Sequence, residues 1–168
     1  MSYRTPIIRQ ISWRQSIPQM IILTGIIAIS IFLLKGTTPI YNSIMLAAGI
    51  YLLYSFGSRY LILTAHRRGI RLFRNHNYSD AIGEFEKSYE FFSRHPWIDQ
   101  WRSVILLSSS AVGYREMALL NIAFCYGQIG QGNKAKEHYQ RVLSEFPGSG
   151  IATAALKMID SVEKGLQP

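Results

Sequence analysis

The chain has 168 residues, 48% of them hydrophobic, and a net charge of +8 that is unevenly distributed. Residues 1–75 contain nine Lys and Arg and no Asp or Glu, giving +9, whereas residues 76–168 contain nine Lys and Arg against ten Asp and Glu, giving −1. A nucleic-acid-binding domain normally carries its basic charge on the folded domain, so this separation argues against nucleic acid as a partner. The single cysteine, Cys125, excludes an intrachain disulfide, and its apolar helical surroundings indicate a buried side chain rather than a nucleophile.

Two uncharged apolar stretches, residues 17–34 and 40–58, follow one another near the N-terminus. The first has eighteen residues and as a helix would span about 27 Å, close to the thickness of a bilayer's hydrocarbon core. A cleaved signal peptide is one alternative, but the stretch is too long, no small-x-small cleavage site ends it, and a second stretch follows. A buried soluble hairpin is another alternative, although such paired runs are rare in soluble domains. We therefore expect residues 1–60 to be a membrane anchor with two transmembrane helices.

The basic residues that flank these stretches predict their orientation. Arginines precede the first stretch and follow the second, whereas the connecting turn offers only Lys35. By the positive-inside bias both termini lie in the cytoplasm, as in a multi-pass protein of the cell (inner) membrane. The arginines between positions 59 and 74 are expected to attract anionic lipid, or alternatively to dock an acidic partner. The side chains expected at the membrane interface are Trp13, Arg14, Arg59, Tyr60, Arg67 and Arg68.

A second pattern covers residues 117–147 and predicts two short helices folded back on each other. Apolar residues recur at helical spacing on both sides of a glycine-rich turn at 128–133, and Pro147 ends the pattern. The recurring landmarks are Leu119, Ile122, Ala123, Tyr126, Ala135 and Tyr139. Their identities and intervals resemble one tetratricopeptide repeat. Ala123 stands where that family usually has glycine, and either residue lets two helices approach closely.

An earlier, looser copy of this repeat begins where the apolar stretches end. Gly69 and Ala81 are twelve residues apart, as are Ala123 and Ala135, and this equal spacing indicates an internal repeat. Arg68 replaces the leucine that the family usually has, and the closing proline comes late. Because the two copies are separated by about twenty extra residues, the sequence leaves open whether they pack as direct neighbours.

The sequence thus predicts an all-α chain, a two-helix transmembrane hairpin followed by a tetratricopeptide-like helical-repeat domain. The expected boundaries are a membrane anchor at 1–60 and a repeat domain at 61–168, with repeats at about 62–96 and 116–149, an insert at 97–115 and a capping helix at 150–165. Ser79 and Asp80 are expected to cap the second helix of the first repeat. Trp97 and Trp101 are expected to fill the gap between the repeats, or alternatively to touch the membrane interface or a partner.

The sequence contains no pattern that indicates chemistry, so neither an enzyme nor a cofactor is expected. The glycines at 127, 130 and 132 lack the following Lys-Ser/Thr of a phosphate-binding loop, and the four histidines at 66, 76, 95 and 138 lack metal-ligand spacing. The resemblance instead implies binding of a protein partner on a concave surface formed by the first helix of each repeat. Carried onto this chain, the contact residues are His66, Ile70, Phe73, Arg74, Leu120, Asn121, Phe124 and Gln128. Ile70, Leu120 and Phe124 could alternatively belong to the core.

These patterns together predict a membrane-anchored adaptor or scaffold that mediates protein–protein interaction on the cytoplasmic side. The alternative is a structural accessory subunit of a larger membrane complex, which it would contact through the transmembrane hairpin. Repeats of this kind bury their apolar faces only against neighbours, and a stack usually needs at least three. If two repeats and a capping helix do not suffice, a second copy or another subunit must cover the remainder.

Overall fold

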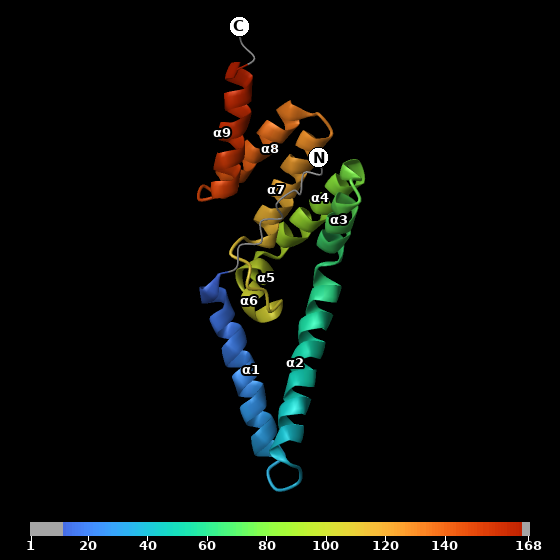
Figure 1. Ribbon diagram of the computed structural model, residues 1–168, viewed down its shortest axis with the longest axis vertical. Helices are drawn as coiled ribbons and strands as arrows, with labels where there is room; N and C mark the ends of the chain where they lie inside the picture. Colours follow the sequence, from blue (N-terminus) through green and yellow to red (C-terminus); the bar gives the residue numbers. More distant parts are fainter. Residues whose placement is uncertain (1–11, 166–168) are drawn as a thin grey trace. The chain divides into compact units, whose positions relative to one another are not determined.

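The computed structural model describes residues 12–165, which form helices and short connections with no strand among them (Figure 1). These residues divide into two compact units. The first unit, here called the hairpin unit, comprises residues 12–62 and 100–113, and the second, the repeat unit, comprises residues 63–99 and 114–165. The predicted all-α fold, with two apolar helices followed by a helical-repeat region, is confirmed. The predicted insert is divided between the two units.

The hairpin unit is built on α1 (Trp13–Leu33) and α2 (Ile40–Ile62), which pack against each other. Their contact includes the small buried side chains of Ser30, Ser43 and Ala47. Both helices are long and apolar enough to cross a membrane, by length and composition. Each extends about one turn beyond the predicted stretch, because backbone hydrogen bonds continue into the polar flanks regardless of side-chain hydrophobicity.

The repeat unit is a stack of helices in chain order. Its main helices are α3 (Thr64–Arg74), α4 (Tyr78–Arg94), α7 (Tyr114–Gln128), α8 (Gly132–Glu145) and α9 (Gly150–Gly165). Each packs on the next, and α4 of the first copy lies directly on α7 of the second (Figure 1). The helix pair α3–α4 and the helix pair α7–α8 are therefore direct neighbours in the stack.

The chain accommodates the extra residues by holding their two ends together. Asp99 lies in the short helix α5 (Pro96–Gln100), and its carboxylate accepts hydrogen bonds from the backbone N–H groups of Tyr114 at 2.8 Å and Arg115 at 3.1 Å. These N–H groups begin α7 and have no partner within their own helix. A carboxylate at a helix N-terminus is also electrostatically favourable. Residues 100–113 therefore leave and rejoin the repeat unit at one place, and α7 can stack on α4.

The close approach of α3 to α4 depends on Gly69. A Cβ atom added at this position would lie 2.8 Å from Cδ1 and Cε1 of Phe85, a fully buried side chain of α4. At the corresponding position of the second copy, Ala123 is fully buried between α7 and its neighbours. The structure thus gives the physical reason for a small residue at this landmark of each copy.

Two local predictions are wrong. The N-cap of α4 is Asn77, whose side chain accepts from the backbone N–H of Asp80, so the helix begins before Ser79 and Asp80 rather than at them. Trp97 and Trp101 do not fill a gap between the repeats, since their side chains are 55% and 58% exposed. The direct contact of α4 with α7 leaves no gap for them to fill.

Candidate protein-binding surface

The first helices of the two repeats, α3 and α7, meet through aromatic side chains. The rings of Phe73 on α3 and Phe124 on α7 lie 5.3 Å apart between centroids, and Tyr78 packs edge-on against Phe73 at 5.6 Å. All three side chains are half-buried, so each keeps part of its ring accessible. Offset and edge-to-face ring contacts of this kind stabilise the packing beyond the apolar area that they bury.

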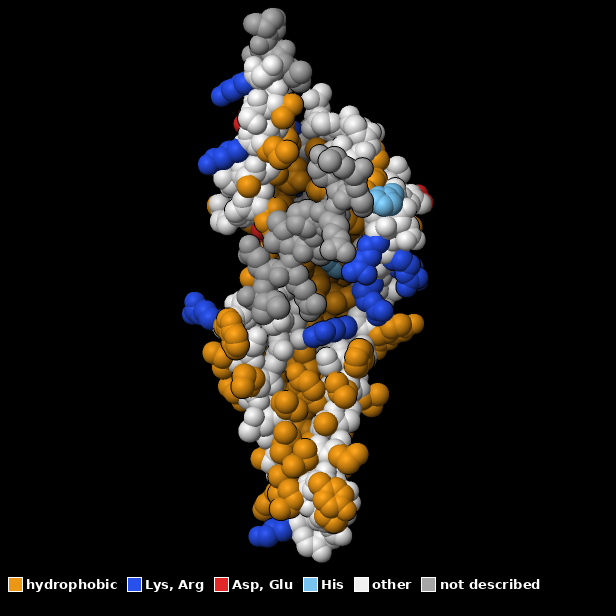
Figure 2. All heavy atoms as spheres, in the orientation of Figure 1, with side chains coloured by type: hydrophobic (Ala, Val, Ile, Leu, Met, Phe, Trp, Pro, Cys, Tyr) orange, Lys and Arg blue, Asp and Glu red, His pale blue; other side chains and the backbone are white. Residues whose placement is uncertain are grey.

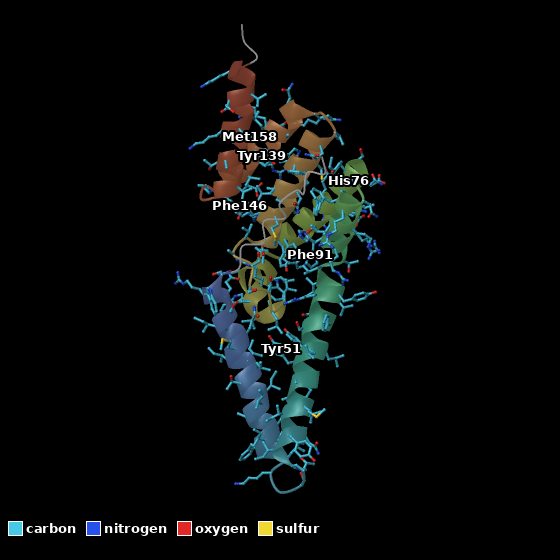
Figure 3. The ribbon with its side chains drawn as sticks, in the orientation of Figure 1. Tyr51, His76, Phe91, Tyr139, Phe146 and Met158 are labelled. Atoms are coloured by element: carbon cyan, nitrogen blue, oxygen red, sulfur yellow. The ribbon has the colours of Figure 1, made fainter. Side chains whose placement is uncertain are left out.

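The turn after α3 extends this aromatic group. His76 adopts a left-handed backbone conformation with φ of 59°, and its Nδ1 atom lies 2.8 Å from the hydroxyl of Tyr78. Figure 3 shows His76 at the end of the first repeat helix, close to the start of α4. No feature of the sequence pairs His76 and Tyr78 with Phe73.

Six of the eight predicted contact residues remain accessible in the repeat unit. Ile70, Phe73, Asn121 and Phe124 are half-buried, and Arg74 and Gln128 are exposed. The structure brings Phe73 and Phe124 into contact and places the other four on the same two helices. We keep these six residues as the candidate surface.

His66 and Leu120, by contrast, lie in the interior and are each 7% exposed. His66 packs edge-on against the rings of Phe85 and Tyr114, and its Nδ1 atom is 3.1 Å from the hydroxyl of Ser88. Burial lowers the pKa of His66 to about 4, because the charged imidazolium would lose its hydration. His66 is therefore neutral at physiological pH and packs as a core side chain.

The electrostatics of the candidate surface differ between its two helices. Arg67, Arg68, Arg71 and Arg74 are all exposed on α3, and the last three make no ion pair within residues 12–165. Figure 2 shows Lys and Arg side chains gathered in this region. The candidate residues of α7 are uncharged, so the surface combines a positive helix with a neutral, partly aromatic one.

The residues predicted for the membrane interface fall into two groups. Trp13 and Tyr60 are 84% and 67% exposed near the ends of α1 and α2, and Arg14, Arg67 and Arg68 are also exposed. Arg59 differs, because its Nε donates to the carbonyl of Leu106 at 2.8 Å and its Nη2 donates to the carbonyl of Leu107. Its guanidinium group thus binds two residues that lie 47 and 48 positions later in the chain, and no local sequence pattern indicates this contact.

The metal-ligating and thiol side chains of the described residues are scattered or buried. Between residues 12 and 165 no three His, Cys, Asp or Glu side chains lie close enough to hold a metal ion. Cys125 is buried, as predicted, and burial raises the pKa of its thiol to about 12, so it is not a reactive thiolate at neutral pH.

Comparison with known families gives one finding, a match of residues 117–149 to a tetratricopeptide-repeat model. The match begins inside α7, includes all of α8 and ends just before α9. No curated protein and no solved structure matches the chain. The matched residues form the antiparallel helix pair that the motif requires, with the small landmark Ala123 buried at the helix contact. Residues 117–149, which form α7 and α8, are therefore similar to one tetratricopeptide repeat.

Proposed function

We propose that this protein is a membrane-anchored, non-catalytic adaptor whose repeat unit binds a cytoplasmic protein through α3 and α7. The observation that carries the proposal is the pair of half-buried rings, Phe73 and Phe124, in contact across the first helices of the two repeats. Repeats of this family typically serve as binding scaffolds. Aromatic side chains, phenylalanine among them, are also enriched at protein interfaces relative to the rest of the protein surface.

The proposed membrane anchor is supported by how little of α1 and α2 the rest of the chain covers. In the most apolar eighteen-residue stretch of each helix, only 6% of α1 and 11% of α2 is buried, whereas the core helix of a soluble protein would be mostly buried. Figure 2 shows hydrophobic side chains along the outside of this hairpin. In water so large an apolar surface would favour aggregation, and a bilayer removes that cost. The flanking arginines favour cytoplasmic termini and contact with anionic headgroups.

Copurification from native membranes tests the adaptor function. The full-length protein is compared with Phe73→Ala, Phe124→Ala and the charge reversal Arg74→Glu, which affects an exposed side chain and should leave the fold intact. Tyr126→Ala is the matched control, because Tyr126 is also a half-buried aromatic residue of α7 but stacks on His138 of α8 at 5.1 Å. We expect partner recovery to fall in the first three variants and not in the control. Equal recovery in all four would contradict the assignment of the surface.

A second candidate function, that of an accessory subunit held in a larger membrane complex, is favoured by the same uncovered apolar surface of α1 and α2. That surface suits contact with other transmembrane helices as well as with lipid. Replacing residues 12–62 by an unrelated two-helix anchor separates the two functions. Retained partner recovery supports the adaptor, and loss of assembly supports the accessory subunit.

A further inference from the structure

The segment 100–113 belongs to the hairpin unit although it is inserted in the sequence between the two repeats. Its helix α6 (Arg102–Ile105) packs on α1, and the carbonyl of Ser109 accepts from the backbone N–H of Ser12 at 2.8 Å. Figure 1 shows α6 between α1 and α2 at the open end of the hairpin. The segment therefore contacts both apolar helices near their polar ends.

Four consecutive carbonyl groups of this segment, those of residues 104–107, accept hydrogen bonds from side chains. The hydroxyl of Tyr54 donates to the carbonyls of Val104 and Ile105 at 3.4 and 3.1 Å. Arg59 donates to the next two carbonyls, those of Leu106 and Leu107. Irregular backbone is tolerated at membrane depth only where its polar groups find partners in the protein, because an unsatisfied carbonyl in hydrocarbon is costly.

The backbone conformation of the segment is itself held by these contacts. Leu107 has φ of 44°, a left-handed conformation that bulky side chains rarely adopt. Leu106 and Leu107 are nevertheless fully buried or nearly so. Such a conformation persists only where surrounding interactions fix it, and the guanidinium of Arg59 supplies one at each of these two carbonyls.

The depth of these contacts follows from their positions along α2. At ~1.5 Å per residue α2 is about 35 Å long, slightly more than the ~30 Å hydrocarbon core. Arg59 and Tyr54 precede the last residue of α2, Ile62, by about one and two turns. If α2 crosses a bilayer, the carbonyls that these side chains bind lie at the headgroup boundary and just beneath it.

The exposed aromatic residues of the hairpin unit fit the same level. Trp13 begins α1, Tyr60 lies near the end of α2, and Trp101 directly precedes α6. All three are more than half exposed, and residues 100–113 contain no Asp or Glu. Trp and Tyr are enriched at membrane–water interfaces because their rings prefer the headgroup region to either water or hydrocarbon.

We propose that residues 100–113 are a third membrane element, an interfacial segment that lies in the headgroup region of the bilayer with Trp101 inserted there and Arg59 holding it against α2. The proposal rests on the membrane insertion of α1 and α2 proposed above. It gives the repeat unit two further chain connections to the membrane, one at each end of the segment, in addition to the connection after α2.

Tryptophan fluorescence in vesicles tests this placement, because the chain has only three tryptophans, at 13, 97 and 101. The full-length protein is reconstituted in phosphatidylcholine vesicles with lipids brominated at a shallow or a deep acyl position. The variant Trp13→Phe/Trp97→Phe reports on Trp101, and Trp97→Phe/Trp101→Phe reports on Trp13. We expect shallow bromines to quench Trp101 more than deep ones, and to an extent within about twofold of Trp13.

The outcomes separate this inference from the proposed membrane anchor. Quenching of Trp13 without quenching of Trp101 would overturn the interfacial placement and leave the anchor intact. Absence of quenching at both positions would overturn the anchor and the placement together.

The role of Arg59 is tested by Arg59→Gln in the variant that retains only Trp101. Arg14→Gln is the matched control, since Arg14 is exposed at the start of α1 and, among the described residues, makes no hydrogen bond or ion pair with residues 100–113. We expect quenching of Trp101 by the shallow bromines to fall by about twofold or more in Arg59→Gln and to stay unchanged in Arg14→Gln. Unchanged quenching in both variants would overturn the role of Arg59 in holding the segment.

Discussion

The substitution Gly69→Ala should destabilise the first helix pair although alanine is the better helix former. The added methyl group would lie 2.8 Å from two ring atoms of Phe85 and 3.1 Å from a third, whereas carbon atoms in contact normally lie about 3.5–4 Å apart. Phe85 is fully buried, so its ring can move only if the surrounding core moves. Overpacking of this kind costs about 1–3 kcal/mol, against a gain of about 1 kcal/mol in helix propensity.

Gly83→Ala provides the matched control, because Gly83 lies within α4 and an added Cβ there would meet no atom within 4 Å. This change should stabilise the protein by about 1 kcal/mol through helix propensity alone. We therefore expect the free energies of unfolding of the two variants to differ by about 1–3 kcal/mol, with Gly69→Ala the less stable. Urea unfolding of the full chain in detergent, followed by far-UV circular dichroism, measures both. Equal stabilisation by the two substitutions would refute the close approach of α3 to α4.

Three further predictions concern single side chains of the repeat unit. Asp99→Ala should lower the free energy of unfolding by about 1–2 kcal/mol, measured by urea, because the first N–H groups of α7 lose their acceptor. Lowering the pH from 7 to 5 should lower the free energy of unfolding by about 2 kcal/mol through His66, because its pKa of about 4 in the folded state lies below the unfolded value of 6.5. The variant His66→Gln should lack this part of the pH dependence. Glu145→Gln should lower the free energy of unfolding by about 1 kcal/mol, since this carboxylate accepts from Tyr89 and pairs with Arg115 and Arg141. The control Glu90→Gln removes an exposed ion pair and should cause no measurable change.

These three measurements can each contradict their premise. An unchanged urea midpoint in Asp99→Ala would mean that the capping bonds contribute nothing, and equal losses for the two glutamate variants would remove the distinction between the shared carboxylate and the exposed one. For His66→Gln, the informative result is the slope of stability between pH 4 and 6.5, where the stability of the wild type should fall as the pH falls. A slope as steep as that of the wild type would assign the effect to other groups, including His138, whose pKa burial also lowers.

The parts of the fold that the sequence predicted are those specified by residues close together in the chain. Helix pairs are such parts, since the spacing of Ala123 and Ala135 encodes two helices, the turn between them and the face on which they meet. The long uncharged stretches predicted α1 and α2 for the same reason. The candidate surface was predicted less completely, because a helical position such as that of His66 can face either the groove or the core, and only the packing of Phe85 and Tyr114 around it decides.

The contacts that the sequence could not predict join residues far apart in the chain. The bonds from Asp99 to the start of α7 span 15 and 16 positions, and the bonds from Arg59 to the segment 100–113 span 47 and 48. Neither has a periodic pattern that would reveal it. In both, a charged side chain forms hydrogen bonds with backbone groups that have no partner in regular secondary structure. Many other charged side chains in the sequence could do the same.

Asp99 and Arg59 contact different parts of the same insertion, its ends and its interior. The effects of removing the two contacts should therefore be separable. Asp99 fixes the ends of the segment within the repeat unit, whereas Arg59 binds its interior within the hairpin unit. Loss of the first contact should weaken the stacking of α7 on α4 and lower the urea midpoint, with little effect on lipid quenching of Trp101. Loss of the second should reduce that quenching and leave the urea midpoint of the repeats nearly unchanged. If Asp99→Ala and Arg59→Gln altered both properties in parallel, the insertion would be a single cooperative element of both units rather than a segment held independently at its ends and at its middle.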